Sequence, residues 1–127
     1  MTLTSNGHVE APATNQAGLP GHHFSFGAIL ARAARNFGDR LAVTDTITER
    51  TFSELHVRTD SLAAALNKQG VVPGTRIAVL SQNRTEFVET FYACAKLGAI
   101  LVPINHRLAA SEIAHALDDA DPSVVIV

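Results

Sequence analysis

The sequence has very little cysteine, no tryptophan and no long hydrophobic run. Cys94 is the only cysteine among 127 residues, so an internal disulfide is impossible and a reducing compartment fits the chain. No apolar stretch approaches the roughly 20 residues of a membrane helix. No basic segment followed by an apolar run marks a signal peptide at the N-terminus. We therefore expect a cytoplasmic protein without a membrane span.

The sequence also lacks a large excess of charge of either sign. Ten Lys and Arg residues stand against twelve Asp and Glu residues, which gives a formal net charge of −2. This balance supplies no electrostatic footprint for nucleic acid or for an anionic membrane surface. Hydrophobic residues make up 46% of the chain, so the protein can bury the core of one domain or of part of one.

The N-terminal residues are small, polar and aperiodic, and residues 1–22 are predicted to form a disordered tail. His22 and His23 could bind a metal. Two neighbouring histidines lack a third ligand and a fixed geometry, so we assign them no metal. Residues 23–127 are predicted to form the first part of a larger N-terminal domain.

The first ordered part is predicted to be a helix, a hairpin and a second helix. Apolar residues at helical spacing predict a helix over residues 26–37, with Gly38 as its C-cap. The segments "LAVTD" and "ERTF" predict a hairpin, although its turn lacks Asn-Gly or Asp-Gly. A longer helix is predicted over residues 53–69, and its N-cap is either Thr51 or Ser53.

Three evenly spaced apolar runs follow, "RIAVL", "AILVP" and "SVVIV". They do not alternate with polar residues, so we expect parallel strands buried on both faces. Two amphipathic helices separate them, and Asn83 with Glu86 has the spacing of a capping box. The fold class is therefore α/β, with a hairpin and helix followed by a βαβαβ unit. The last run ends at Val127 without an exit, so we expect this unit to belong to a larger domain.

Polar residues follow two of the predicted strands. They are Ser81, Gln82, Asn83, Asn105, His106 and Arg107. Ligands of parallel sheets bind outside the carboxyl ends of the strands, so neighbouring strands would bring these residues into one pocket wall. Alternatively, Asn83 caps a helix, Arg107 is solvated, and Asn105 and His106 only lead the chain out of its strand. For Asn105 and His106 both interpretations stay open.

The residues after the first of these strands argue against a dinucleotide site. A dinucleotide fold needs glycines there so that backbone amides can approach phosphate, whereas this loop reads "SQNRTE". The chain also lacks a Walker loop and a Gly-x-Ser-x-Gly nucleophile elbow. A small nucleotide-binding domain is therefore disfavoured.

Three acidic residues near one helix end, Asp118, Asp119 and Asp121, resemble a metal cluster. Adjacent helical residues do not converge on one point, so we predict a solvated helix end. Acids at a helix C-terminus oppose the macrodipole, which a basic partner beyond the sequence would relieve.

The remaining chemistry-bearing residues have structural explanations. Cys94 lies among apolar residues of a predicted helix, which indicates a buried, inert thiol. His56 and His115 are single histidines without ligand spacing, and we assign them no role.

Four segments in order resemble the opening of an AMP-forming acyl-adenylate synthetase. They are "RTFSEL" (50–55), "PGTRIAVLSQN" (73–83), "KLGAILVPIN" (96–105) and "EIAHALDDADPSVVIV" (112–127). This superfamily comprises acyl-CoA synthetases, adenylation domains of nonribosomal peptide synthetases and beetle luciferases. The likeness covers about residues 26–127.

Individual residues refine this resemblance. Phe52 stands where the family often has Tyr, and Ala109 stands where it often has a Thr or Ser helix cap, a loss of about 0.5–2 kcal/mol. Asn105 in "PIN" is similar to the acid–CoA ligases, because peptide-synthetase domains tend to have Asp there. The resemblance favours a fatty or aryl acid–CoA ligase.

The resemblance implies activation of a carboxylic acid as acyl-AMP, followed by transfer to coenzyme A. ATP, Mg²⁺, coenzyme A and the acid would bind the full-length parent. The family's phosphate loop, metal acid, ribose Asp and mobile Lys lie downstream of the matching segments. We therefore expect no catalytic, cofactor-binding or metal residue here, and no activity of this chain alone. The alternative is a stand-alone interaction module that pairs through its open sheet edge.

Overall fold

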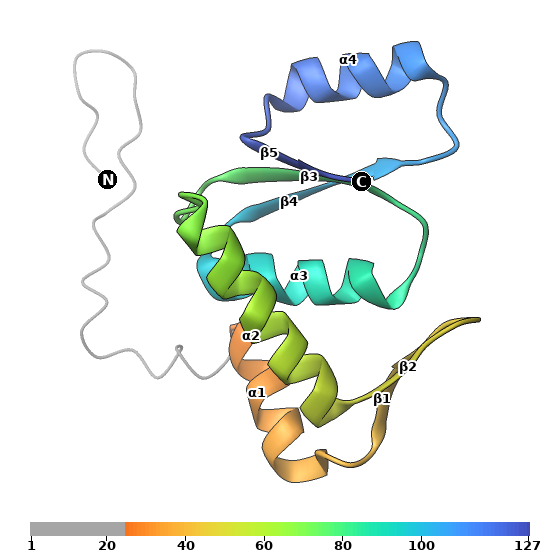
Figure 1. Ribbon diagram of the computed structural model, residues 1–127. Helices are drawn as coiled ribbons and strands as arrows, with labels where there is room; N and C mark the ends of the chain where they lie inside the picture. Colours follow the sequence, from red (N-terminus) through yellow and green to blue (C-terminus); the bar gives the residue numbers. More distant parts are fainter. Residues whose placement is uncertain (1–24) are drawn as a thin grey trace, which may run out of the picture.

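The computed structural model describes residues 25–127, which form helices on both faces of a parallel sheet (Figure 1). The predicted tail over residues 1–22, with His22 and His23, lies outside the described residues. The elements are α1 (Phe26–Phe37), β1 (Leu41–Thr44), β2 (Glu49–Thr51), α2 (Phe52–Lys68), β3 (Arg76–Ser81), α3 (Thr85–Leu97), β4 (Ile100–Asn105), α4 (Ala110–Ala120) and β5 (Val124–Ile126). The predicted α/β class and element order are confirmed.

Gly38 is the C-cap of α1 as predicted, but it does not adopt the left-handed conformation that usually favours glycine at this position. Its backbone is right-handed, with φ −48° and ψ −44°. A Cβ atom at this position would lie 2.5 Å from the Ser53 Oγ and 2.8 Å from the carbonyl oxygen of Ala34. Glycine is favoured here because a Cβ atom would be crowded by the last turn of α1 itself and by the Ser53 side chain of α2.

The β1–β2 hairpin turns without an Asn-Gly pair because Asp45 supplies the turn. Its Oδ1 accepts hydrogen bonds from the backbone amides of Ile47 and Thr48, each at 2.8 Å. The Asp45 amide in turn donates to the carbonyl of Thr48. A side chain that bonds its own backbone in this way mimics a backbone turn.

The N-cap of α2 is Thr51, which decides between the two predicted caps. The Thr51 Oγ1 accepts from the Glu54 amide at 3.3 Å, and the Glu54 carboxylate accepts from the Thr51 amide at 2.8 Å. Phe52 therefore opens the helix rather than closing the preceding strand, and α2 runs one residue ahead of the predicted 53–69 at both ends.

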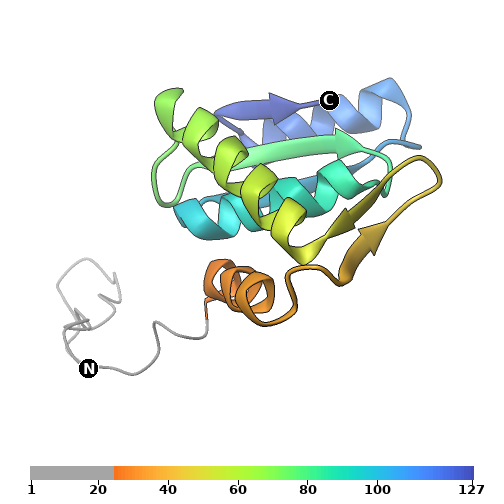
Figure 2. The same ribbon diagram turned by 60° about the horizontal axis from the view of Figure 1, so that its bottom comes forward.

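The sheet has the strand order β4-β3-β5, and both pairings are parallel. Figure 1 shows α4 on one face and α3 on the other, with α1 and α2 forming a further layer beyond α3. In Figure 2 the β1–β2 hairpin lies at the end of the molecule toward which β3 and β5 point. The predicted βαβαβ unit is confirmed.

Burial on both faces is confirmed for β3 and wrong for the two outer strands. Ile77, Ala78 and Val79 of β3 are at most 1% exposed, whereas Ile100 of β4 and Val125 of β5 are 50% and 46% exposed. The middle strand is covered by strands on both sides and helices on both faces. The outer strands each have one strand neighbour among the described residues, so the helices cover them only in part.

The main core lies between the sheet and α3, and it extends to α2. Its buried members are Ala63, Leu66, Val71, Ile77, Val79, Ala93 and Cys94. The predicted burial of Cys94 is confirmed, with 1% of the residue exposed. Burial raises the pKa of its thiol, which keeps the sulfur protonated and unreactive.

Candidate functional site at the carboxyl edge of the sheet

The two predicted polar loops lie side by side because β3 and β4 are neighbours. Their register pairs Ser81 with Asn105 at the last position of both strands. A hollow of about 470 Å³ opens between the loops. It is lined by Ser81, Asn83, Phe87, Pro103, Ile104, Asn105, His106 and Arg107. The expected grouping of these loops is therefore confirmed.

Asn105 combines the two interpretations left open by the sequence. Its Oδ1 accepts a hydrogen bond from the Arg107 amide at 3.0 Å, which turns the chain out of β4. Asn105, His106 and Arg107 are all exposed, and all three line the hollow. A ligand-contacting role for Asn105 and His106 stays a prediction.

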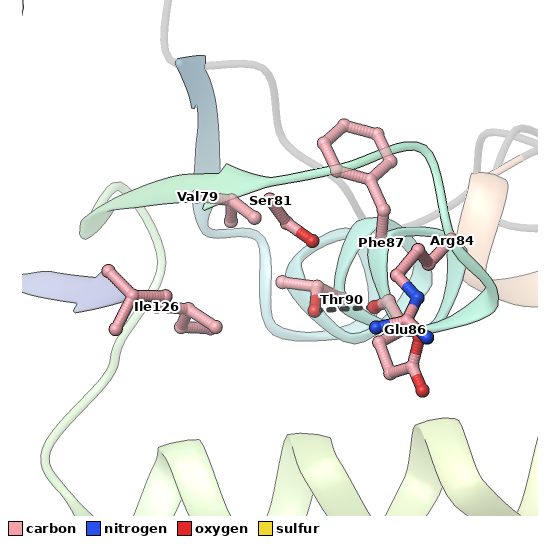
Figure 3. A pocket seen from close by; sticks show the side chains of 8 residues that line it. Val79, Ser81, Arg84, Glu86, Phe87, Thr90 and Ile126 are labelled. Atoms are coloured by element: carbon pink, nitrogen blue, oxygen red, sulfur yellow. Dashed lines mark hydrogen bonds between the residues drawn. The ribbon is translucent and has the colours of Figure 1, made fainter. Parts of the chain in front are cut away.

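A second hollow, of about 320 Å³, lies on the other side of β3 (Figure 3). Figure 3 shows Arg84, Glu86 and Phe87 at the start of α3 on one side, and Ile126 of β5 on the other. The chain places β4 on one side of β3 and β5 on the other, so the strand order reverses at this hollow. In open α/β sheets such a reversal is called a topological switch point, and it is where ligands generally bind. Sequence reasoning missed this hollow because strand order is not written in a local pattern.

The predicted capping box of Asn83 and Glu86 is wrong. The N-cap of α3 is Arg84, which makes no side-chain cap bond. Because the helix begins one residue later than predicted, Glu86 occupies the second helical position rather than the third. Asn83 is therefore an exposed residue of the hollow and not a cap.

The first turn of α3 is capped from a distance of forty residues. The Asp45 Oδ2 in the hairpin turn accepts a hydrogen bond from the Thr85 amide at 2.9 Å. This bond, followed by the one from the Ile47 amide, lowers the pKa of Asp45 to about 2. A carboxylate near the positive end of a helix is favoured electrostatically. The sequence holds no local signal for this role of Asp45, because forty residues separate it from Thr85.

Two threonine hydroxyls at the start of α3, beside the second hollow, already have hydrogen-bond partners. The Thr90 Oγ1 donates to the Glu86 carbonyl at 2.8 Å, and the Thr85 Oγ1 donates to the Glu86 carboxylate at 3.4 Å. Within residues 25–127 no three His, Cys, Asp or Glu side chains are grouped so that they could hold a metal. The Ser81 hydroxyl, which lines both hollows, donates to the Gln82 carbonyl at 3.1 Å.

The acidic helix end is solvated as predicted, but its basic partner comes from upstream. Asp118 and Asp119 are exposed, and Asp121 is the left-handed C-cap of α4 at φ 42°. The Arg76 Nη2 donates to the Asp121 carboxylate at 3.0 Å, and the guanidinium also donates to the carbonyls of Ala120 and Asp121. A cation at these carbonyls offsets the unfavourable acids.

The two single histidines lie away from the hollows. His115 is exposed on α4. The His56 Nδ1 lies 3.0 Å from the Lys96 Nζ, and the Lys96 Nζ also bonds to the Asp60 carboxylate, which ties α2 to α3.

No helix within the described residues 25–127 combines the length and apolar character needed to cross a bilayer.

Comparison with known proteins identifies relatives of this chain. A feruloyl-CoA synthase from Amycolatopsis sp is 41% identical over 100 residues, which are 79% of this chain and 20% of that protein. A long-chain-fatty-acid–CoA ligase from Mycobacterium tuberculosis is 41% identical over 81 residues, 64% of this chain and 16% of the ligase. The chain thus spans about a fifth of the length of these curated relatives.

A solved structure shares the fold described above. The N-terminal domain of FACL13 from Mycobacterium tuberculosis superimposes with a TM-score of 0.76 at 35% identity, over 80% of this chain and 26% of that one. The family model described as "AMP-binding enzyme" matches residues 30–127. This match covers all four segments that carried the resemblance. The chain therefore belongs to the AMP-binding enzyme family.

Proposed function

We propose that this chain is part of an AMP-forming acid–CoA ligase. The observation that carries the proposal is the family match over residues 30–127, joined to relatives whose names are CoA synthase and CoA ligase. Asn105 at the end of β4 supports the same subgroup. A carboxylate oxygen would attack the α-phosphorus of ATP and release pyrophosphate. The thiol of coenzyme A would then attack the acyl carbon of acyl-AMP, lose its proton, and release AMP.

The described residues support this reaction as a scaffold. They build the sheet, the helical layers and the hollows at its carboxyl edge, and they bring together no carboxylate set for Mg²⁺. We assign no catalytic, cofactor-binding or metal residue within residues 25–127. We expect the 127-residue chain alone to be inactive, with the reducing cytoplasm as its compartment.

The first test is the mass and activity of the native protein. An antibody to residues 26–127 would capture it from its source. We expect an intact mass several times 13.5 kDa, and pyrophosphate release that depends on both ATP and an acid. Ferulate and a long-chain fatty acid are the first probes, and the CoA thioester would be identified by its mass. The 127-residue chain is the control, with no release expected. A large native protein that releases no pyrophosphate with any acid would contradict the proposal.

A second candidate is a stand-alone interaction module. The half-exposed residues Ile100 and Val125 on the outer strands favour it, because an open strand edge can pair with another chain. A native mass near 13.5 kDa together with sharp two-state unfolding would support this candidate over the ligase.

A further inference from the structure

Asp45 divides its two carboxylate oxygens between two parts of the fold. Oδ1 accepts from the amides of Ile47 and Thr48 within the hairpin turn. Oδ2 accepts from the Thr85 amide at the first residue of α3. The side chain is half-buried between these partners. One carboxylate therefore closes the hairpin and holds α3 at the same time.

The start of α3 has no local side chain that could replace this bond. Arg84 occupies the N-cap position without a side-chain cap bond, and Asn83, one residue earlier, lines the hollow between β3 and β4. Thr85 is 1% exposed, so solvent cannot take over its amide. A buried backbone donor without a partner is costly. The position of the first turn of α3 thus depends on the hairpin.

This first turn forms the shared wall of both hollows. Phe87 lines each of them, and Ser81 at the end of β3 does the same. Arg84 and Glu86 line the hollow between β3 and β5. A shift of the turn by the length of one hydrogen bond would therefore reshape both hollows together.

We propose that Asp45 is a positioning residue for the carboxyl edge of the sheet. Its carboxylate clamps the first turn of α3 and keeps the two hollows in the shape that a substrate of the ligase meets. The substrate part of this inference rests on the proposed function. The clamp itself rests only on the contacts of Asp45 with Thr85, Ile47 and Thr48.

The informative variant is Asp45→Asn. Its single carbonyl oxygen can still accept from the turn amides, while its NH₂ group would face the Thr85 amide, donor against donor. The matched control is Thr51→Ala, which removes the N-cap of α2 next to the same hairpin but touches no group of α3. Each variant removes one side-chain cap of a helix, α3 in Asp45→Asn and α2 in Thr51→Ala. Only Asp45→Asn removes the contact between the hairpin and α3.

The first readout is amide hydrogen exchange in the native protein. For Asp45→Asn we expect exchange at Thr85 and Glu86 to rise about tenfold, the change expected when a hydrogen bond to a charged group is lost. Thr51→Ala should leave these two amides unchanged and speed exchange at Glu54. Equal exchange at Thr85 in both variants would overturn the clamp. If Asp45→Asn does not fold, Asp45→Glu replaces it, and exchange at Thr85 equal to the wild type with this displaced carboxylate would overturn the clamp as well.

The second readout is steady-state kinetics with ATP, acid and coenzyme A. We expect Asp45→Asn to raise KM for at least one of the three about fivefold or more, with kcat within about twofold, because the clamp shapes a binding edge rather than the reacting atoms. Kinetic constants identical to those of Thr51→Ala would overturn the substrate part. A wild-type protein without any acid-dependent activity would refute the proposed function and the substrate part together, whereas hydrogen exchange would still decide the clamp.

Discussion

Arg58 on α2 and Glu89 on α3 form a two-pronged ion pair across the helical layer. The Arg58 Nη2 donates to one carboxylate oxygen of Glu89 at 3.1 Å, and the Nε donates to the other. The Glu89 side chain is 6% exposed, whereas the Arg58 side chain is 48% exposed. The pair therefore satisfies a buried charge from the solvent side, and it raises the pKa of Arg58.

Removing only the cation should cost stability. In Arg58→Met the buried carboxylate of Glu89 loses both donors, and we expect the free energy of unfolding to fall by about 1–3 kcal/mol. The Arg58→Met/Glu89→Leu double variant should recover most of this loss, because apolar replacement of both partners is often neutral. Urea unfolding of the three proteins tests this, and an unchanged midpoint for Arg58→Met would contradict it.

Thr59 of α2 carries a buried hydroxyl that has no hydrogen-bond partner among the described residues. The residue is 0% exposed. Thr59→Val keeps the shape and removes the unsatisfied group, so we expect equal stability or a gain of up to about 1–3 kcal/mol. Thermal unfolding measures the change.

The matched control for this variant is Thr90→Val. The Thr90 Oγ1 donates to the Glu86 carbonyl at 2.8 Å in a similarly buried position. Its loss should cost about 0.5–1.5 kcal/mol. If the two valine variants change stability in the same direction and by the same amount, the hydroxyl of Thr59 has a partner after all.

Stability at low pH should follow Asp45. Its pKa is about 2, below the ordinary value of 3.8, so the folded protein binds this proton more weakly than the unfolded chain. The stabilisation is fully present above pH 3.8 and is lost as the pH falls through about 2. We therefore expect Asp45→Asn to show a shallower loss of stability between pH 4 and pH 2 than the wild type. Parallel pH profiles for the two proteins in this window would show that the carboxylate is not responsible.

Local sequence patterns predicted the helices and strands, whereas features that depend on contacts between distant residues were not predicted. The Thr51–Glu54 box, the helix over 26–37 and the three apolar runs lie within short windows, where spacing reports structure directly. The cap of α3 comes from Asp45, and the partner of Asp121 is Arg76. Both bonds span at least forty residues, so only the tertiary fold shows them. The hollow between β3 and β5 could not be predicted for the same reason, since it depends on the order of the strands in the sheet.

Ala109 leaves half of a capping box unused at the start of α4. The Glu112 carboxylate accepts from the Ala109 amide at 2.8 Å, while Ala109 itself offers no acceptor to the helix. Its backbone is already extended, at φ −65° and ψ 155°, which is the conformation of an N-cap. Ala109→Ser should therefore complete the box and raise the free energy of unfolding by about 0.5–2 kcal/mol.

The control for this gain is Ala110→Ser, which places the same hydroxyl one residue into α4, where it is not at the cap position. Thermal and urea unfolding of both variants measure the difference. A gain in Ala109→Ser alone would show that the missing side-chain cap at residue 109 lowers stability. An equal change in both variants would mean that added polarity, and not capping, sets the effect, because only residue 109 has the extended backbone that directs a hydroxyl to the amides of the first turn.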